Sequence, residues 1–487
     1  MQKTLVILVL EYRILLVKKQ KFPLFSLFSR NKEVIKLAVP VFIELILGVG
    51  IGYVNQFMFA GVPQATNAIG QVNQISNIFI VAFSVLSTSS LILITQLKGL
   101  DNEEGIKKIY PLTLFLNLFI GIIVCGILLA ISPFIFDWMQ VDAQIIPLAK
   151  LYLYVSAPSL VFYSLYQAFS SFLRANKKMV QPTIITFATN IINIVICAIV
   201  LWGIPNLDIE DQLIGVGLAT LISRFISCFI SYIFFKVTVK SKISFRSLRP
   251  FPSMLLKKQL KIGLPTAGET LSYNLSQFVL AIIVNYSCTV LDQNLRTYIM
   301  TITSIIYLFA SGSGIAMQVI EGNLLGNQNK EEVYKLVSDT GKMAQIVSFV
   351  MSLIVLGIAY PLFGALMTPA INNPAININN VDFMYCGLTA VFCLCINVVL
   401  EQGRATNLVY VKGLETAGDI AFPVISSIIT SWVFTVGASA LLCTVFKLGI
   451  YGAFIGACLD ECVRGFGFFI RWRNGRWKTI NLLKGIN

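Results

Sequence analysis

Two glutamates occupy matching places near the start of two long apolar segments. Residues 37–44 read LAVPVFIE and residues 262–269 read IGLPTAGE, so Glu44 and Glu269 each follow a proline by four residues. A carboxylate in a membrane segment is costly and usually marks an ion or substrate site. The proline frees one backbone carbonyl beside each carboxylate. The pattern predicts a site for Na⁺ or H⁺ at both glutamates, unless each one pairs with a polar neighbour and only fixes packing.

Other ionisable side chains are spaced for pairing along one helix. Glu401 and Arg404 lie three residues apart and therefore share a helix face. They could form a self-neutralised pair, or the pair could open when a cation replaces the arginine at Glu401. Asp460 and Arg464 are four residues apart, and their spacing favours a structural or gating pair.

Amide and aromatic side chains in the apolar segments could complete a site. Amide oxygens can ligate Na⁺ or bind a substrate, and an aromatic ring can face a hydrophobic cation. Membrane helices also use such side chains only to link or pack helices. The candidates for the cation and substrate site are Glu44, Asn55, Asn190, Glu269, Tyr273, Asn274, Gln277 and Glu401.

Several absences narrow the chemistry. The chain has no histidine, so imidazole cannot carry protons or bind a metal. Its ten cysteines lack a closed metal-type spacing, and no phosphate loop or nucleophile constellation is present. We therefore expect no enzyme and no cofactor, apart from the coupling ion, which is Na⁺ or H⁺.

The elements that carry these residues are long apolar helices. Of the 487 residues, 56% are hydrophobic and only 12% are charged, with a mean hydropathy of +0.79. A soluble protein of this size would need more surface charge. A span needs about 20 apolar residues, and such segments recur along the chain. We predict twelve, at 37–60, 72–97, 110–136, 148–174, 180–202, 213–237, 262–287, 296–320, 343–367, 388–413, 420–444 and 448–471.

The basic residues predict the orientation of these spans. Most of the 37 lysines and arginines fall in the N-terminal segment, in alternate loops and in the tail, including the Arg174–Lys178 cluster. The opposite face has only Lys150, Arg296 and Lys447. The positive-inside rule then places both termini in the cytoplasm. The net charge of +14 is explained by this topology and by anionic headgroups, so no nucleic-acid partner is expected.

The second half of the chain repeats the first. Residues 97–99 match residues 324–326, and the prolines at 133 and 182 match those at 361 and 423. Each half holds six predicted spans, so the halves share one orientation and are related by an axis along the membrane normal. We predict two six-helix bundles with pseudo-twofold symmetry. The expected divisions are an extension at 1–36, bundles at 37–239 and 262–472, a basic linker at 240–261 and a tail at 473–487.

At this point the residues resemble a known family. The phrases LAVPV at 37–41, GYVNQFMFAG at 52–61 and AIGQ at 68–71 are similar to the N-terminal half of multidrug and toxic compound extrusion (MATE) transporters. The second half contributes GRATN at 403–407, GLETAGDIAFP at 413–423, DECVR at 460–464 and RWRNGRW at 471–477. The resemblance covers roughly residues 30–480.

The resemblance implies export of bulky, often cationic, amphipathic compounds, driven by inward flow of Na⁺ or H⁺. It also implies a multi-pass protein of a bacterial plasma membrane. The protein is expected to be a monomer in contact with membrane lipid. The chain departs from well-known members at Asn55 and Tyr273, where acids are common, and its Glu269 and Glu401 lie one turn from the family's acids. These departures leave the coupling ion open.

One alternative carrier function remains open. A lipid-linked oligosaccharide flippase of a related family would share the architecture, and it would be expected to place several basic residues in its cavity to hold pyrophosphate. Here Arg224, Arg404 and Arg464 are the basic residues expected within spans, and two of them lie beside acids. The pattern therefore favours a cation-attracting cavity and a cationic cargo.

Overall fold

The computed structural model describes residues 23–59, 62–139, 141–372 and 382–485, and the first 22 residues of the predicted extension lie outside this set. Its regular elements are helices in the described residues. They are α2 (Pro23–Arg30), α3 (Lys32–Met58), α4 (Pro63–Gly99), α5 (Glu103–Trp138), α6 (Ile146–Ser156), α7 (Ser159–Ala175), α8 (Val180–Ala198), η1 (Ile199–Gly203), α9 (Ile209–Phe234), η2 (Phe235–Val239), η3 (Phe245–Leu248), α10 (Ser253–Ser287), α11 (Val290–Gly326), α12 (Lys330–Gly357), α13 (Ala359–Ile371), α14 (Phe383–Ala417), α15 (Ala421–Thr430), η4 (Ser431–Ala438), η5 (Leu441–Val445), α16 (Gly449–Arg473) and η6 (Arg476–Thr479).

The predicted all-helical, twelve-span fold is confirmed. Eight helical stretches in the described residues are long and apolar enough to cross a membrane, and a ninth is formed if α6 and α7, bent by 46°, count as one span. Three further long helices, α3, α10 and α16, complete the set. Each of these three carries an acid of the predicted sites. Glu44 lies on α3, Glu269 on α10 and Asp460 on α16.

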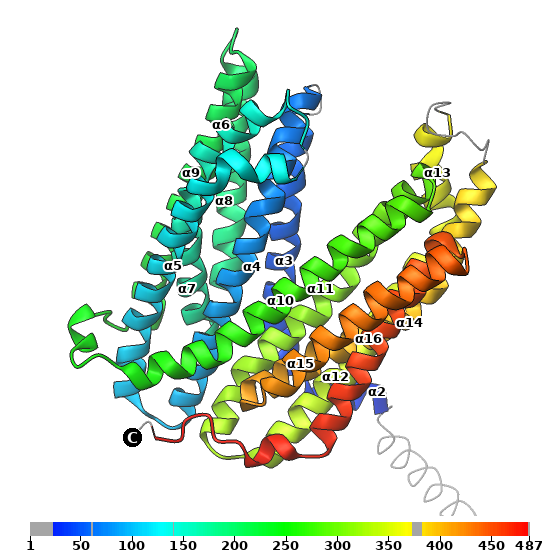
Figure 1. Ribbon diagram of the computed structural model, residues 1–487. Coiled ribbons are helices and arrows are strands. Elements are labelled where there is room, and N and C mark those ends of the chain that lie inside the picture. The colour runs from blue at the N-terminus through cyan, green and yellow to red at the C-terminus, as the bar shows by residue number, and fades with distance from the viewer. Residues whose placement is uncertain (1–22, 60–61, 140, 373–381, 486–487) are drawn as a thin grey trace, which may run out of the picture.

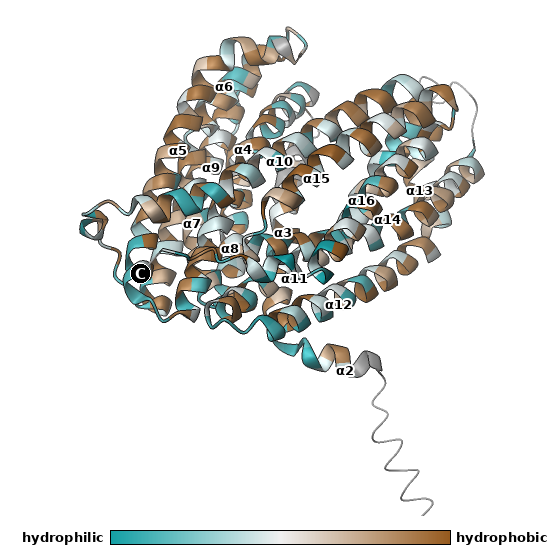
Figure 2. Ribbon diagram, turned by 60° about the horizontal axis from the view of Figure 1, so that its bottom comes forward, coloured by the Kyte–Doolittle hydropathy of each residue, from teal (hydrophilic) through white to brown (hydrophobic). Residues whose placement is uncertain are grey.

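The helices form two bundles, which we name the N-lobe (α3–α9) and the C-lobe (α10–α16). The lobes touch where α11 packs against α3 and α4, and where α10 packs against α4. In Figure 1 the bundles lie together at the end that carries the C-terminus and diverge toward α6 and α13. Figure 2 shows brown apolar residues over the outer helices and teal polar residues in the loops near the C-terminus.

Glycines allow the lobes to approach closely at their shared end. A Cβ atom on Gly99 of α4 would lie 2.8 Å from the Cα of Gly326 on α11, and a Cβ on Gly326 would lie 2.6 Å from the Cα of Gly99. The sequence repeat had matched these two positions. Gln96, one turn before Gly99, also donates a hydrogen bond to the carbonyl of Thr416 at 2.6 Å. The contact is therefore symmetric and leaves no room for a side chain at either glycine.

The end of the molecule where the lobes touch is also its basic end. It contains the C-terminal ends of α4 and α11, the start of α5 and the start of α12. Lys98, Lys107, Arg174 and Lys330 lie in or beside these helix ends. We call it the basic end. The helices run past their apolar segments here, and α10 begins at Ser253, nine residues before its predicted span.

Candidate functional site

The candidate site lies in the C-lobe, where α14 and α16 make their closest approach. A Cβ on Gly403 of α14 would lie 2.7 Å from the backbone nitrogen of Cys462 on α16. A Cβ on Gly465 of α16 would lie 2.5 Å from the carbonyl oxygen of Gly403. Small residues let membrane helices pack backbone to backbone. This contact brings the side chains next to Gly403 and Cys462, namely Arg404 and Glu461, within hydrogen-bonding range.

Arg404 is held by two carboxylates. Its Nη1 lies 2.7 Å from Oε1 of Glu401, one turn back on α14, and its Nε lies 3.1 Å from Oε1 of Glu461. Asn407 donates a hydrogen bond to the second oxygen of Glu461 at 2.9 Å. All four residues are buried. Such a pair persists in a low-dielectric interior only when its remaining lone pairs and protons also find partners.

Arg464 of α16 extends the same network to α10. Its Nη2 lies 2.6 Å from Asp460 and 3.6 Å from Glu461, and its Nη1 lies 3.9 Å from Glu269 of α10. The guanidinium carbon lies 5.3 Å from the ring centre of Tyr273, one turn along α10 from Glu269. The network therefore connects three helices.

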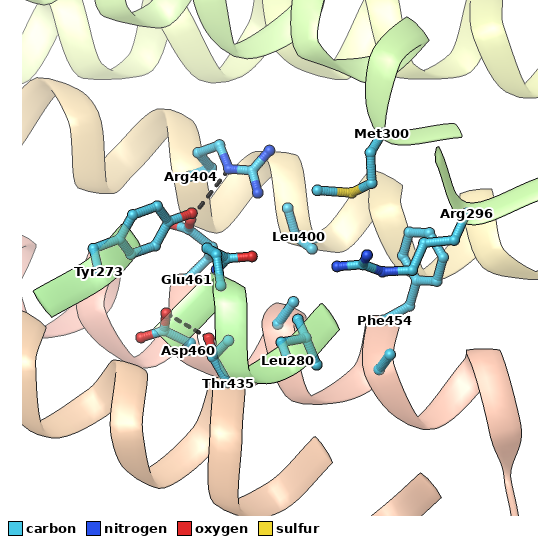
Figure 3. Close-up of a pocket in the computed structure, with 13 residues that line it drawn as sticks. Tyr273, Leu280, Arg296, Met300, Leu400, Arg404, Thr435, Phe454, Asp460 and Glu461 are labelled. Carbon is cyan, nitrogen blue, oxygen red and sulfur yellow. Dashed lines mark hydrogen bonds and ion pairs between the residues drawn. The ribbon is translucent and has the colours of Figure 1, made fainter. Parts of the chain in front are cut away.

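A small cavity opens beside these groups. Its volume is about 10 Å³, which is room for a single water molecule or a bare ion. Tyr273, Gln277, Arg404, Asp460 and Glu461 line it, and Arg296 extends into the same space from α11 (Figure 3). A drug-sized molecule needs a pocket of roughly 300 Å³ or more. The cavity therefore suits a cation and not a bulky cargo.

The charges around this cavity do not cancel. The group contains four carboxyl groups and three guanidinium groups, so the ionised set carries one net negative charge. Oε2 of Glu401 is also buried without a hydrogen-bond partner among the described residues. We call this group the acid cluster. Its members are Glu269, Arg296, Glu401, Arg404, Asp460, Glu461 and Arg464.

Glu44 lies in the N-lobe, in a separate ion pair. Its Oε1 lies 2.8 Å from Nη2 of Arg174 on α7, and it accepts a hydrogen bond from the hydroxyl of Tyr166 at 3.0 Å. The sequence analysis treated Arg174 only as a topology signal, and that interpretation was too narrow. The last turn of α7 points Arg174 back into the bundle, where it neutralises the buried acid.

Comparisons with known proteins agree with this fold. A family model named MatE matches residues 40–199. "Uncharacterized transporter YisQ" of Bacillus subtilis (strain 168) is 26% identical over 94% of this chain and 96% of its own length. "Probable multidrug resistance protein NorM" of Thermotoga maritima is 23% identical over 93% and 94%. The structure described as "Outward-facing conformation of a multidrug resistance MATE family transporter of the MOP superfamily" superimposes with a TM-score of 0.80 at 19% identity, covering 91% of this chain and 95% of that chain. Residues 40–199 therefore match the MatE family, and the fold of the chain is that of MATE transporters.

The family predicted from the sequence is therefore confirmed, and MATE proteins are transporters and not enzymes. The structure brings together seven of the singled-out side chains within one lobe. They are Glu269, Tyr273, Gln277, Arg404, Asp460 and Arg464, and Glu401, which is joined to them through Arg404.

The remaining candidates lie elsewhere. Asn190 of α8 donates a hydrogen bond to the carbonyl of Leu47 on α3 at 2.9 Å, so it links two N-lobe helices. Asn274 is half-buried on α10 and is not among the side chains that line the C-lobe cavity. The side chain of Asn55 lies outside the described residues. Glu44 stays with Asn190 in the N-lobe.

Two members of the acid cluster were missed. The sequence analysis counted Arg296 only among the basic residues of the outer face, at the first position of the span 296–320, but it lies inside α11 and lines the cavity. A signal was available, because Thr289 and Asp292 form a capping box that starts the helix at Val290. Glu461 was noted beside Asp460 but was not proposed as a site. Its bridge between Arg404 and Arg464 depends on how α14 meets α16, which spacing along one helix does not show.

Proposed function

We propose that this MATE protein is a secondary active exporter that exchanges Na⁺ or H⁺ for lipophilic or cationic compounds by alternating access. The names of its relatives as multidrug resistance proteins support the class of cargo. The observation that carries the coupling role is the net negative charge of the acid cluster beside a cavity of ionic size. A buried charge without compensation is costly, so the cluster is stabilised by taking up one monovalent cation.

A link between the acid cluster and lobe movement supports the exchange mechanism. Glu269 of the cluster lies on α10, which reaches both lobes. At its start, Gln259 donates a hydrogen bond to Thr113 of α5 at 3.2 Å. Farther along, Trp432 of η4 donates a hydrogen bond to Ser272 of α10 at 3.0 Å. A cation that changes the charge at Glu269 therefore acts on a helix that connects the lobes.

The direction of transport follows from the basic end. We place that end in the cytoplasm of a bacterial cell, according to the positive-inside rule. The lobe contact at Gly99 and Gly326 then closes the cytoplasmic side, and the described state faces outward. In this state a cation from outside can enter the acid cluster, while cargo leaves to the same side. Cargo and cation thus exchange in turn, as antiport requires.

Transport in proteoliposomes tests this proposal. Purified protein in vesicles containing a fluorescent lipophilic cation is given a sodium gradient alone, and then a proton gradient alone. One of the two gradients is expected to drive dye movement against its concentration gradient, while vesicles without protein show none. If neither the sodium gradient nor the proton gradient drives dye movement, the coupling proposal is overturned.

A further inference from the structure

A second cavity lies between the lobes, near the basic end. It also has a volume of about 10 Å³, and its walls come from α4 and α7 of the N-lobe and from α11 of the C-lobe. Each helix supplies one side chain with a buried polar atom that has no hydrogen-bond partner among the described residues. These atoms are Oγ of Ser87 on α4, Nε of Arg174 on α7 and Oε1 of Gln318 on α11.

Another polar atom of Arg174 and of Gln318 is already engaged. Arg174 uses Nη2 to bind Glu44 at 2.8 Å. Gln318 donates a hydrogen bond from Nε2 to the carbonyl of Lys412 at 3.3 Å. This bond fixes the orientation of the amide, so the atom that faces the cavity without a partner is the oxygen Oε1. Ser87 and Gln318 are buried, with exposed fractions of 4% and 0%. Burying three such atoms unpaired would be costly, so the cavity calls for a ligand that pairs them.

The chemistry of the three atoms selects the ligand. The Nε–H of Arg174 can only donate a hydrogen bond, Oε1 of Gln318 can only accept one, and Ser87 can do either. An anion would leave the oxygen of Gln318 unpaired, and a cation would meet the guanidinium of Arg174. A water molecule can accept from the arginine and donate to the glutamine at once. Its size also matches the cavity.

We propose that this cavity binds one ordered water that hydrogen-bonds Ser87, Arg174 and Gln318 and thereby links the two lobes. The site exists only while α11 lies against α4 and α7, because its partners come from both lobes. The water therefore stabilises the state in which the lobes touch at the basic end. It also borders the Glu44–Arg174 pair, so lobe opening exposes that pair to solvent.

A cryo-electron microscopy map fine enough to show ordered waters tests the site directly. A single water peak within hydrogen-bonding distance of all three atoms is the expected result. An empty cavity, or a density that contacts only Arg174 and Ser87 as an anion would, overturns the proposal. This test does not depend on transport, so it is independent of the proposed exchange function.

Hydrogen exchange with matched variants tests the effect on the lobes. In Ser87→Ala and Gln318→Leu, amides at the ends of α4 and α11 are expected to exchange several-fold faster than in the wild type. Ser84→Ala is the control, because Ser84 lines the same cavity but carries no orphaned buried oxygen. Equal exchange in Ser87→Ala, Gln318→Leu and Ser84→Ala would contradict a bridging water.

Independent contacts point to a second device, in the chain that follows α16. The first part of this tail is anchored to the C-lobe. Trp477 stacks on Trp472 with ring centres 4.2 Å apart and donates a hydrogen bond to its carbonyl at 3.0 Å. Lys330 of α12 donates a hydrogen bond to the carbonyl of Lys478 at 2.7 Å.

The second part of the tail binds the start of α10, the part of the C-lobe that packs against the N-lobe through Gln259 and Thr113 of α5. Lys258 there donates hydrogen bonds to the carbonyls of Leu482 and Lys484 at 2.6 and 2.7 Å. Leu483 is buried in an apolar core that contains residues of both lobes, among them Leu112 of α5 and Leu255 of α10. Figure 1 shows the tail running along the basic end from α16 toward the N-lobe.

We also infer that residues 474–485 form a strap that holds the lobes together at the basic end. Parting of the lobes there is opposed while Lys258 holds the tail and Leu483 stays in the core that both lobes share. Release of the strap is therefore a step in opening that end of the transporter.

Variants of two adjacent lysines test the strap. Lys258→Met removes the donor to both tail carbonyls, and it is expected to raise hydrogen exchange several-fold in residues 480–485 and at the start of α10. Lys257→Met is the control, because Lys257 is exposed beside it. Exchange in Lys258→Met that matches both the control and the wild type would overturn the strap.

Discussion

Glu269→Gln is the sharpest test of the acid cluster. The substitution keeps the size of the side chain and removes one negative charge. The cluster then holds three carboxyl groups against three guanidinium groups, and it is neutral without a bound cation. The variant is therefore expected to fold and to bind the coupling ion more weakly.

The geometry sets the size of the effect. Glu269 lies 3.9 Å from Arg464, and its side chain is 19% exposed. A monovalent cation at a similar distance gains about 4 kcal/mol at an effective dielectric constant of roughly 20. Dehydration of the entering cation offsets part of this gain, and we take the net contribution as about 1.4 to 2 kcal/mol. That is roughly a 10- to 30-fold rise in the half-saturating concentration of the coupling ion.

The assay measures initial rates of dye transport in proteoliposomes over a range of Na⁺ and of H⁺ concentrations. Glu104→Gln is the matched control, because Glu104 is exposed in the first turn of α5. Expression and monodispersity in detergent are measured for both variants. A Glu269→Gln protein with unchanged ion dependence would refute the assignment of Glu269 to the coupling site.

Three further substitutions test other parts of the structure. Arg296→Met raises the net negative charge of the cluster to two, so the half-saturating ion concentration in the dye assay should fall about tenfold; a rise would contradict the charge balance. Gly326→Ala forces a methyl group against Gly99 and should accelerate hydrogen exchange at the lobe contact, whereas Gly126→Ala, in open space, should not. Arg224→Met removes a cation held by Ser159 and by the ring of Tyr163 in the N-lobe, and it should leave the preferred coupling ion unchanged when Na⁺ and H⁺ gradients are compared.

The fold was predictable because each membrane helix can be recognised from its own stretch of sequence. Each span must satisfy its own backbone hydrogen bonds in lipid, so length and hydropathy nearly suffice to find it. The prediction was less accurate at helix ends. Polar turns at the basic end remain helical beyond the apolar window, as α10 does from Ser253. The start of α11 was predicted at Arg296 and not at Val290, because polar residues around Arg296 hid the first turns of the helix.

The site was predictable only within single helices. Residues three or four apart share a face, and the expected Glu401–Arg404 and Asp460–Arg464 pairs are both formed. Contacts between helices were not accessible in this way. The approach of Arg174 to Glu44 depends on how α7 packs against α3, and spacing carries no information about that packing. The role of these groups in coupling stays a prediction.

The glycine contact between α4 and α11 has a consequence for how this chain can evolve. Gly99 and Gly326 are matching positions of the internal sequence repeat, and each packs on the other. A substitution at one glycine therefore affects the packing of the other, and neither half can accept a larger residue at this position alone. Matching positions of a repeat can normally vary independently, but here the two positions constrain each other although they are far apart in the sequence.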